Sequence, residues 1–221
     1  MSTLRRMSPR PRRSYDQYCS AARALDAVGD RWTLLIVREL LAGPRRYTDL
    51  HADLPGVSTD VLASRLKDME REGLTTRRRL PPPAAAYVYE LTERGAGLLP
   101  VLEALGAWGA AELGERRPTD AVRAHWAALP LRRALRRAGA GEGTVEVRLE
   151  EGTFHVRAGD AEDGPVYGDG PAPGEPDARL TLDAGTCAAV CRGELGLRRA
   201  VREGRAGVTG EGTAAKALRE P

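Results

Sequence analysis

Residues 58–92 constrain the fold more than any other part of the sequence, because a helical pattern there runs directly into a short basic hairpin. Leu62, Leu66 and Met69 recur at helical spacing and therefore share one apolar face of a helix, which Gly73 ends. An arginine-rich extended stretch, a proline-rich tip and an aromatic extended stretch follow at residues 74–80, 81–86 and 87–92. The sequence therefore predicts a helix joined to a two-stranded ribbon whose first strand is basic.

Three further helices are predicted before this unit. The apolar patterns at residues 21–29 and 31–43 each end at a glycine, which is typical of the residue that follows the last turn of a helix. A short third helix is predicted to begin with Thr48 as its N-cap. Ser58 or Thr59 is expected to cap the fourth helix, which is the one that leads into the ribbon.

The face of the fourth helix opposite its apolar residues is narrow, polar and partly basic. It carries Asp60, Ser64 and Lys67, and side chains of this kind let a helix approach the base edges in the major groove of DNA. An ordinary amphipathic surface helix shows the same pattern, so the neighbouring ribbon decides the interpretation. Arg77 and Arg79 lie two apart on a strand and share one side, from which they can bind phosphates. The predicted DNA contacts are Arg46, Thr48, Ser58, Thr59, Asp60, Ala63, Ser64, Arg65, Lys67, Arg77 and Arg79.

Three stretches of the N-terminal half resemble the HxlR-type winged helix regulators. They read GDRWTLLIVRELLAGPRRYTDL, PGVSTDVLASRLKDMEREGL and YELTERGAGLLPVLEALGAW, and they stand at residues 29–50, 55–74 and 89–108. The resemblance extends from Cys19 to Trp108 and implies a winged helix-turn-helix fold. It further implies a repressor or activator that binds double-stranded DNA as a homodimer at a palindromic operator.

An apolar stripe at helical spacing follows the ribbon. It consists of Leu98, Leu102, Leu105 and Trp108. Because the small winged domain already has a core, such a stripe is suited to packing on a second copy of the chain. Packing against the C-terminal half is the alternative. In the family that the sequence resembles, this helix joins the first one to form the dimer, and a homodimer contact is therefore the interpretation.

The character of the sequence changes near residue 118. The sequence predicts a disordered basic arm at residues 1–14, a winged helix-turn-helix at residues 15–117 and a small α+β sheet-and-helix domain at residues 118–221. A helix predicted at residues 121–138 joins the two halves. The whole chain is therefore expected to belong to the α+β class.

The C-terminal half is predicted to open with an alternating hairpin, then a long loop at residues 159–176, then strand, helix, helix, short strand and terminal helix. The segments DARLTLDA and RGELGLRRAVREGRAGVTGEG resemble the sterol carrier protein type 2-like fold, in which a five-stranded sheet and helices enclose an apolar cavity. That resemblance implies an apolar small-molecule effector, and a domain that only braces the dimer is the alternative. The residues expected to line the cavity are Leu180, Leu182, Val190, Leu195, Leu197 and Val201.

Few residues suggest other chemistry. Cys19 precedes the first helix, where a redox-sensing thiol and an inert structural cysteine are both consistent with the sequence. Cys187 and Cys191 lie four apart on a predicted helix, but no nearby histidine completes a zinc site, so small core residues are the favoured interpretation. The three histidines are isolated, and no nucleophile-and-base set is recognisable. We therefore expect neither an enzyme nor a bound cofactor or metal.

The three cysteines show no disulfide framework, and the sequence lacks an apolar run of about 18 residues. Both observations indicate a cytoplasmic protein without a membrane partner. The rival interpretation is a lipid or small-molecule carrier, or an accessory protein, whose helix-turn-helix no longer binds DNA. The arginine-rich ribbon beside a slim helix face favours the regulator, because a carrier has no use for that combination.

Overall fold

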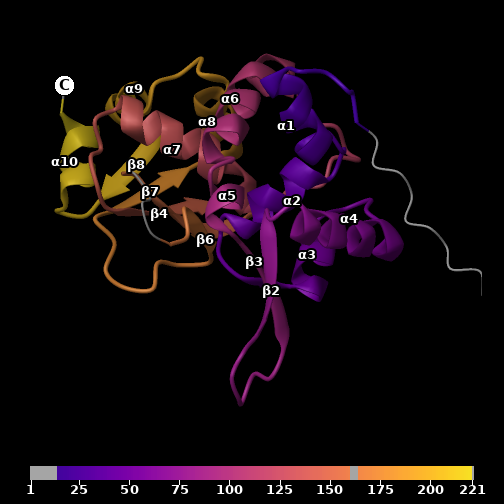
Figure 1. The fold of residues 1–221 in the computed structure, drawn as a ribbon. Coiled ribbons are helices and arrows are strands. Elements are labelled where there is room, and N and C mark those ends of the chain that lie inside the picture. The colour runs from indigo at the N-terminus through magenta and orange to yellow at the C-terminus, as the bar shows by residue number, and fades with distance from the viewer. Residues whose placement is uncertain (1–13, 160–163, 221) are drawn as a thin grey trace, which may run out of the picture.

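The computed structural model describes residues 14–159 and 164–220 (Figure 1). The basic arm predicted at residues 1–14 lies outside the described residues, apart from Ser14. The fold belongs to the α+β class, as predicted. Helices and a small three-stranded sheet form the N-terminal part, and a five-stranded sheet with its own helices forms the C-terminal part.

Four helices open the N-terminal part close to their predicted positions. They are α1 (Ser20–Val28), α2 (Thr33–Leu40), α3 (Tyr47–Asp53) and α4 (Thr59–Arg71). Ser58 caps α4 as predicted, since its hydroxyl accepts a hydrogen bond from the Val61 amide at 3.3 Å. The predicted N-cap at Thr48 is wrong, because α3 begins before it. Arg46 occupies the cap position there, and its backbone N–H donates to the Asp49 carboxylate at 3.3 Å.

The predicted ribbon is present and forms a wing. Its strands β2 (Thr75–Arg79) and β3 (Tyr87–Leu91) pair antiparallel, and the short β1 (Arg45–Arg46) pairs with β3 on the other side. Arg77 lies opposite Tyr89 and Arg79 opposite Tyr87, so the alternation of the strand places both arginines on one face, as predicted. The hairpin projects well away from the rest of the molecule (Figure 1).

The residues of the predicted apolar stripe lie on the helices after the wing, where some are buried and others are exposed. They are α5 (Glu93–Ala96), α6 (Leu99–Gly109) and the 3₁₀ helix η1 (Ala110–Leu113). Leu102 is 8% exposed and belongs to the core of its own chain, and Leu98 packs against that core. Leu105 and Trp108 are 46% and 80% exposed. The expectation that the whole stripe faces a second chain is therefore wrong for Leu102, because α6 packs against α2 and α7 along that face.

The C-terminal part is a mixed five-stranded sheet with helices. Its elements are η2 (Ala124–Ala127), α7 (Ala128–Arg137), β4 (Thr144–Leu149), β5 (Gly152–Arg157), β6 (Tyr167–Asp169), β7 (Ala178–Leu182), α8 (Ala184–Arg192), α9 (Leu197–Arg202), β8 (Ala206–Thr209) and α10 (Thr213–Arg219). The strand order is β6-β5-β4-β7-β8, in which β4 and β7 run parallel and the other neighbours antiparallel. Helices α7, α8 and α9 lie above the strands in Figure 1.

Two expectations for this part need correction. The helix predicted at residues 121–138 is shorter, because the chain at Arg123 is extended (φ −134°, ψ 133°). The Arg123 guanidinium donates to the Ala52 carbonyl at 3.0 Å, and this contact holds the segment against α3 instead of in a helix. The loop predicted at residues 159–176 contains β6, which pairs with β5 through only three residues.

The two parts share one continuous core. Buried residues from α2, α4, α7 and the five-stranded sheet form a single cluster across the predicted boundary at residue 118. The Tyr167 hydroxyl donates to the Arg38 carbonyl at 2.8 Å, and the Val166 amide donates to the Leu41 carbonyl at 2.8 Å. The division into domains at residue 118 stays a prediction. Within the described residues, no helix is both long and apolar enough to cross a bilayer.

Candidate nucleic-acid interface

The exposed face of α4 is the first part of the candidate interface. Leu62, Leu66 and Met69 are at most 1% exposed and anchor the helix on the core, as predicted. The opposite face is therefore presented to solvent. The Tyr47 hydroxyl donates to the Thr59 carbonyl at 2.7 Å, and this hydrogen bond ties α3 to the first turn of α4. Tyr47 carries no signal of this role in the sequence, because the contact spans two helices.

The wing supplies the second part. The guanidinium of Arg77 lies over the Tyr87 ring, 4.0 Å from its centroid, so the tyrosine holds the arginine on the face that Arg79 shares. Arg78 takes the other face and donates to the Glu90 carboxylate from Nε at 3.0 Å and from one terminal nitrogen at 2.9 Å. This hydrogen bonding and the charge of Glu90 raise the pKa of Arg78. The arginine on the face opposite Arg77 and Arg79 is thus paired with a carboxylate of the wing itself.

Most of the predicted DNA contacts lie on exposed surface. Nine of the eleven are exposed and two are half-buried, namely Ala63 and Arg65. Arg65 is engaged elsewhere, because it pairs with Asp68 at 2.5 Å and with Asp30 at 3.5 Å. The other predicted residues lie on β1, α3, the wing, and α4 with its N-cap Ser58, and their contact with DNA stays a prediction.

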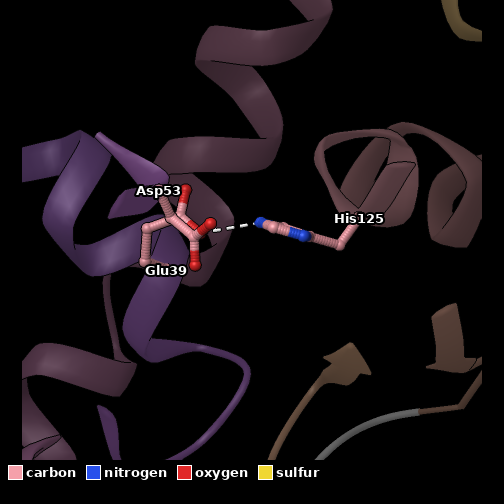
Figure 2. Close-up of side chains that lie close together, drawn as sticks. All are labelled: Glu39, Asp53 and His125. Atoms are coloured by element: carbon pink, nitrogen blue, oxygen red, sulfur yellow. Dashed lines mark hydrogen bonds and ion pairs between the residues drawn. The ribbon is translucent and has the colours of Figure 1, made fainter. Parts of the chain in front are cut away.

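Behind this surface, Glu39 of α2 meets two residues of η2 in the interior. Glu39 is fully buried, His125 is 3% exposed, and the His125 Nε2 lies 2.8 Å from a Glu39 carboxylate oxygen (Figure 2). The Trp126 indole N–H donates to the other oxygen at 3.0 Å, and Arg38 donates to the same oxygen at 2.7 Å. We call Glu39, His125 and Trp126 the seam cluster, because they join the two parts of the chain. In the sequence His125 is isolated, because its partner Glu39 lies 86 residues away.

Electrostatics within the seam cluster keep Glu39 ionised. Burial on its own raises the pKa of a carboxyl group. The hydrogen bond from His125 and the charge of Arg38 outweigh that effect and lower the pKa of Glu39 below its ordinary value. Burial raises the pKa of the neighbouring Tyr167, so that hydroxyl stays a hydrogen-bond donor. The His125 and Tyr167 rings stack with centroids 5.9 Å apart, which adds an apolar contact to the polar one.

A metal-binding site is a second interpretation of part of this cluster. Glu39, Asp53 and His125 bring ligand atoms within 4.8 Å of one another (Figure 2). However, Arg38 pairs with Glu39 at 2.6 Å, and Arg123 pairs with Asp53 at 3.4 Å. These guanidinium groups already pair with both carboxylates, so a divalent cation would have to compete with them for Glu39 and Asp53. The arrangement favours a structural polar cluster over a metal centre.

The residues expected to line an apolar cavity lie in and beside the C-terminal core. Leu180, Leu182, Val190, Leu195 and Leu197 are at most 6% exposed. Val201 is half-buried and packs against them. Residues that line a cavity and residues of an ordinary core are both buried, so the role of these six residues in ligand binding stays a prediction. One cavity that the structure shows lies elsewhere, between residues 122–125 and the ends of strands β5 and β6.

The cysteines occupy two different environments. Cys19 is exposed at the N-terminus of α1, and hydrogen bonds from the Ala22 and Ala21 backbone amides lower the pKa of its thiol. The start of helix α1 is therefore the source of this shift. Cys187 and Cys191 are buried, with sulfur atoms 4.0 Å apart, and both belong to the core as expected.

Comparison with known proteins shows that the N-terminal part is similar to HTH-type transcriptional regulators. A family model described as HxlR-like helix-turn-helix matches residues 27–117. The HTH-type transcriptional regulator YvaP of Bacillus subtilis is 38% identical over 86 residues, which make up 39% of this chain and 80% of that protein. YodB of the same organism is 35% identical over 85 residues, which make up 38% of this chain and 76% of that protein. The solved structure of reduced YodB matches at a TM-score of 0.40 and 30% identity, covering 46% of this chain and 100% of that one.

Proposed function

The chain belongs to the HxlR-like helix-turn-helix family, and we propose that it is a transcriptional regulator. In this proposal α4 contacts the bases of DNA and the wing binds the phosphate backbone of the DNA. The observation that carries the proposal is the slim polar face of α4 beside a projecting arginine-bearing hairpin. Short side chains on α4 allow close approach to the base edges. Arginines on the wing supply affinity for phosphates that does not depend on sequence.

Ser64 and Lys67 are the residues best placed to read bases. Both are exposed on α4, whose opposite face is fixed on the core by Leu62 and Leu66. The hydrogen bond from Tyr47 to the first turn of α4 keeps α3 and α4 in one orientation, so the helix can enter the groove as a rigid unit. Reading bases therefore requires little reordering of the protein.

We infer that the active form is a homodimer on a palindromic operator, joined through α1 and α6. Leu105 and Trp108 on α6 and Leu25 on α1 are large apolar side chains that the single chain leaves exposed. Both helices lie on the side of the molecule away from the wing tip (Figure 1). A contact there would leave both recognition helices free to reach half-sites about 34 Å apart.

The finer functional assignments are proposals as well. We propose a repressor that acts in the cytoplasm, where its DNA is, and that has no enzymatic activity of its own. The C-terminal part would hold an apolar small-molecule effector, as the sterol carrier resemblance implies, and its five-stranded sheet with helices supports that proposal. The alternative, a carrier with an inactive helix-turn-helix, gives no reason for Arg77 and Arg79 to share the exposed wing face.

Cys19 supports a second, compatible function as a sensor of oxidants or electrophiles. Its thiol is exposed, and the backbone amides at the start of α1 lower its pKa. A larger thiolate fraction makes a cysteine a better nucleophile near neutral pH. Because α1 belongs to the proposed dimer contact, modification of Cys19 would change the spacing of the two recognition helices.

The test of the main proposal begins with footprinting of the full-length protein on the DNA upstream of its own gene. Ser64→Leu should then abolish binding to the protected site, since a bulky side chain on α4 blocks close docking. The matched control is Lys216→Leu, which places a leucine on the exposed side of α10, remote from α4. Both variants should melt within a few degrees of the wild type, as exposed positions change stability by about 0.5 kcal/mol or less. Unchanged operator affinity in Ser64→Leu would rule out α4 as the reading helix.

A further inference from the structure

Three polar side chains on the exposed face of α4 have no partner among the residues that the structure describes. They are Asp60, Ser64 and Lys67. On the flank of the same helix, Asp68 pairs with Arg65 at 2.5 Å and with Arg71 at 2.6 Å. The charges beside the exposed face are therefore satisfied within the chain, while the hydrogen-bonding groups on the face itself are available to an external partner.

Asp60 lies in the first turn of α4, where hydrogen bonds hold the backbone on both sides of it. The Ser58 hydroxyl accepts from the Val61 amide at 3.3 Å, and the Tyr47 hydroxyl donates to the Thr59 carbonyl at 2.7 Å. In helix-turn-helix proteins the N-terminal residues of the recognition helix contact the base edges. Asp60 is thus a carboxylate on an ordered turn, at the end of α4 that the proposed function places in the groove.

The chemistry of a carboxylate restricts which base it can contact, because an ionised carboxylate accepts hydrogen bonds and donates none. In the major groove guanine presents two acceptors, thymine an acceptor and a methyl group, and adenine an acceptor beside its amino group. Cytosine presents the N4 amino group alone, so it is the base that suits Asp60. Lys67 has the reverse chemistry, since its ammonium group only donates and guanine offers both O6 and N7 as acceptors.

Helical geometry sets the distance between these two contacts. Asp60 and Lys67 are seven positions apart on α4, which corresponds to about two turns and about 10.5 Å along the helix axis. Successive nucleotides of one DNA strand rise by about 3.4 Å along the duplex axis. With α4 lying along the groove, the two contacts fall about three base pairs apart, and the shorter Ser64 side chain lies between them.

We propose that Asp60 determines part of the operator sequence by accepting a hydrogen bond from N4 of a cytosine, while Lys67 donates to a guanine about three base pairs away. This inference rests on the proposed function of α4 as the reading helix and adds which base pairs that helix selects. The Asp60 carboxylate also repels DNA phosphates, so it lowers the affinity for DNA that offers no cytosine at that position. The attraction and the repulsion both favour the operator over other DNA.

Selection of binding sites by the full-length protein from a pool of randomised DNA measures the base preference at every position. The wild type should select a cytosine, and Asp60→Asn should select adenine at that position instead, because an amide can bind N6 and N7 of adenine together. Lys67→Gln should keep the cytosine preference and replace guanine by adenine about three base pairs away. An unchanged preference in Asp60→Asn would overturn the proposal, and so would two changes that fall on the same base pair.

Affinity measurements on the selected DNA test the hydrogen bond at the level of one atom. Cytosine methylated at N4 still pairs with guanine, but it no longer offers its free N4 hydrogen to the major groove. The wild type should bind the methylated site at least about fivefold more weakly, as expected for the loss of one base contact. Asp60→Ala should bind both sites equally, and a wild-type protein that is insensitive to the methylation would refute the hydrogen bond.

The matched control for charge is Glu211→Gln, which removes one negative charge from a side chain that is 92% exposed and lies between β8 and α10. It should change neither the base preference nor the affinity for random DNA, whereas Asp60→Asn should bind random DNA more tightly.

Two further results would be negative, and they are distinguishable. A melting temperature that falls in Asp60→Asn without any shift in base preference would show that Asp60 only stabilises the start of α4, and it would overturn this inference alone. A folded wild-type protein that binds no DNA at all would contradict the proposed function, and the inference would fall with it.

Discussion

The seam cluster gives the most direct test of how the two parts of the chain stabilise each other. Glu39 is fully buried and accepts hydrogen bonds from Arg38 at 2.7 Å, from Trp126 at 3.0 Å and from His125 at 2.8 Å. Glu39→Ala removes the acceptor for all three and leaves two buried donors without a partner. Breaking a buried pair in this way costs about 3–5 kcal/mol. Since proteins of this kind are stable by about 5–15 kcal/mol, the loss is a large part of the total.

Glu39→Gln is the more informative change, because it keeps the shape of the side chain. The amide oxygen can still accept from Trp126, but the charge that attracts Arg38 and His125 is gone. Each charge-assisted hydrogen bond is worth about 1.5–3 kcal/mol. Arg38 retains 20% exposure and can turn partly to water, so its share is discounted. We therefore expect Glu39→Gln to lower the free energy of unfolding by about 2–3 kcal/mol.

Urea unfolding followed by far-ultraviolet circular dichroism measures both losses. The control is Glu175→Gln, whose side chain is 80% exposed and pairs with Arg179 on the surface. This control should match the wild type within experimental error, because exposed ion pairs contribute little. A Glu39→Gln protein as stable as the control would show that the seam cluster does not hold the two parts together.

The pH dependence of the same difference provides an independent check. The folded-state pKa of Glu39 is lowered, because the His125 hydrogen bond and the Arg38 charge outweigh burial. A group with a lowered folded pKa binds fewer protons in the folded state, so its contribution is complete above its unfolded pKa. That contribution is lost as pH falls through the folded pKa. The stability gap between wild type and Glu39→Gln should therefore be constant near neutral pH and shrink in acid, and a gap that grows in acid would contradict this account.

Three further predictions concern the DNA and dimer surfaces. Replacing both Arg77 and Arg79 with Ala should weaken specific and non-specific DNA binding alike, and it should flatten the dependence of DNA affinity on salt by about one unit per lost phosphate contact. The control Arg202→Ala, on α9, should change neither the affinity nor its salt dependence. A change in sequence preference with an unchanged salt dependence would mean that Arg77 and Arg79 read bases. If the proposed homodimer forms, Trp108→Ser should convert it to monomers in light-scattering measurements without loss of helicity, and a dimer that persists would place the contact elsewhere. Cys19 should react with iodoacetamide at neutral pH faster than a free cysteine, because its pKa is lowered, and labelling at the rate of a buried thiol would exclude it as a sensor.

The elements that could be predicted from sequence are those whose signals are local. The apolar spacing predicts helix α4 with a cap at Ser58 or Thr59, and the structure confirms the helix and selects Ser58. The wing was identified by a glycine, a basic strand and a proline-rich tip, and the register of β2 and β3 confirms that Arg77 and Arg79 share one face. The hairpin of β4 and β5 and the later order of strands and helices were equally predictable. Periodicity, caps and turn residues act over a few positions, so one sequence reveals them.

Tertiary structure decided what depends on distant partners. Strand β6 has three residues and no periodicity of its own, and it forms because β5 offers an edge and because the Tyr167 hydroxyl reaches the Arg38 carbonyl, 129 residues away in the sequence. His125 looked isolated until the fold placed it on Glu39. The same holds for Leu102, whose helical pattern shows that α6 has an apolar face but not which chain covers it. Sequence periodicity determines which side of an element is apolar, while the packing of elements far apart in the chain determines what that side, and each buried polar group, finally contacts.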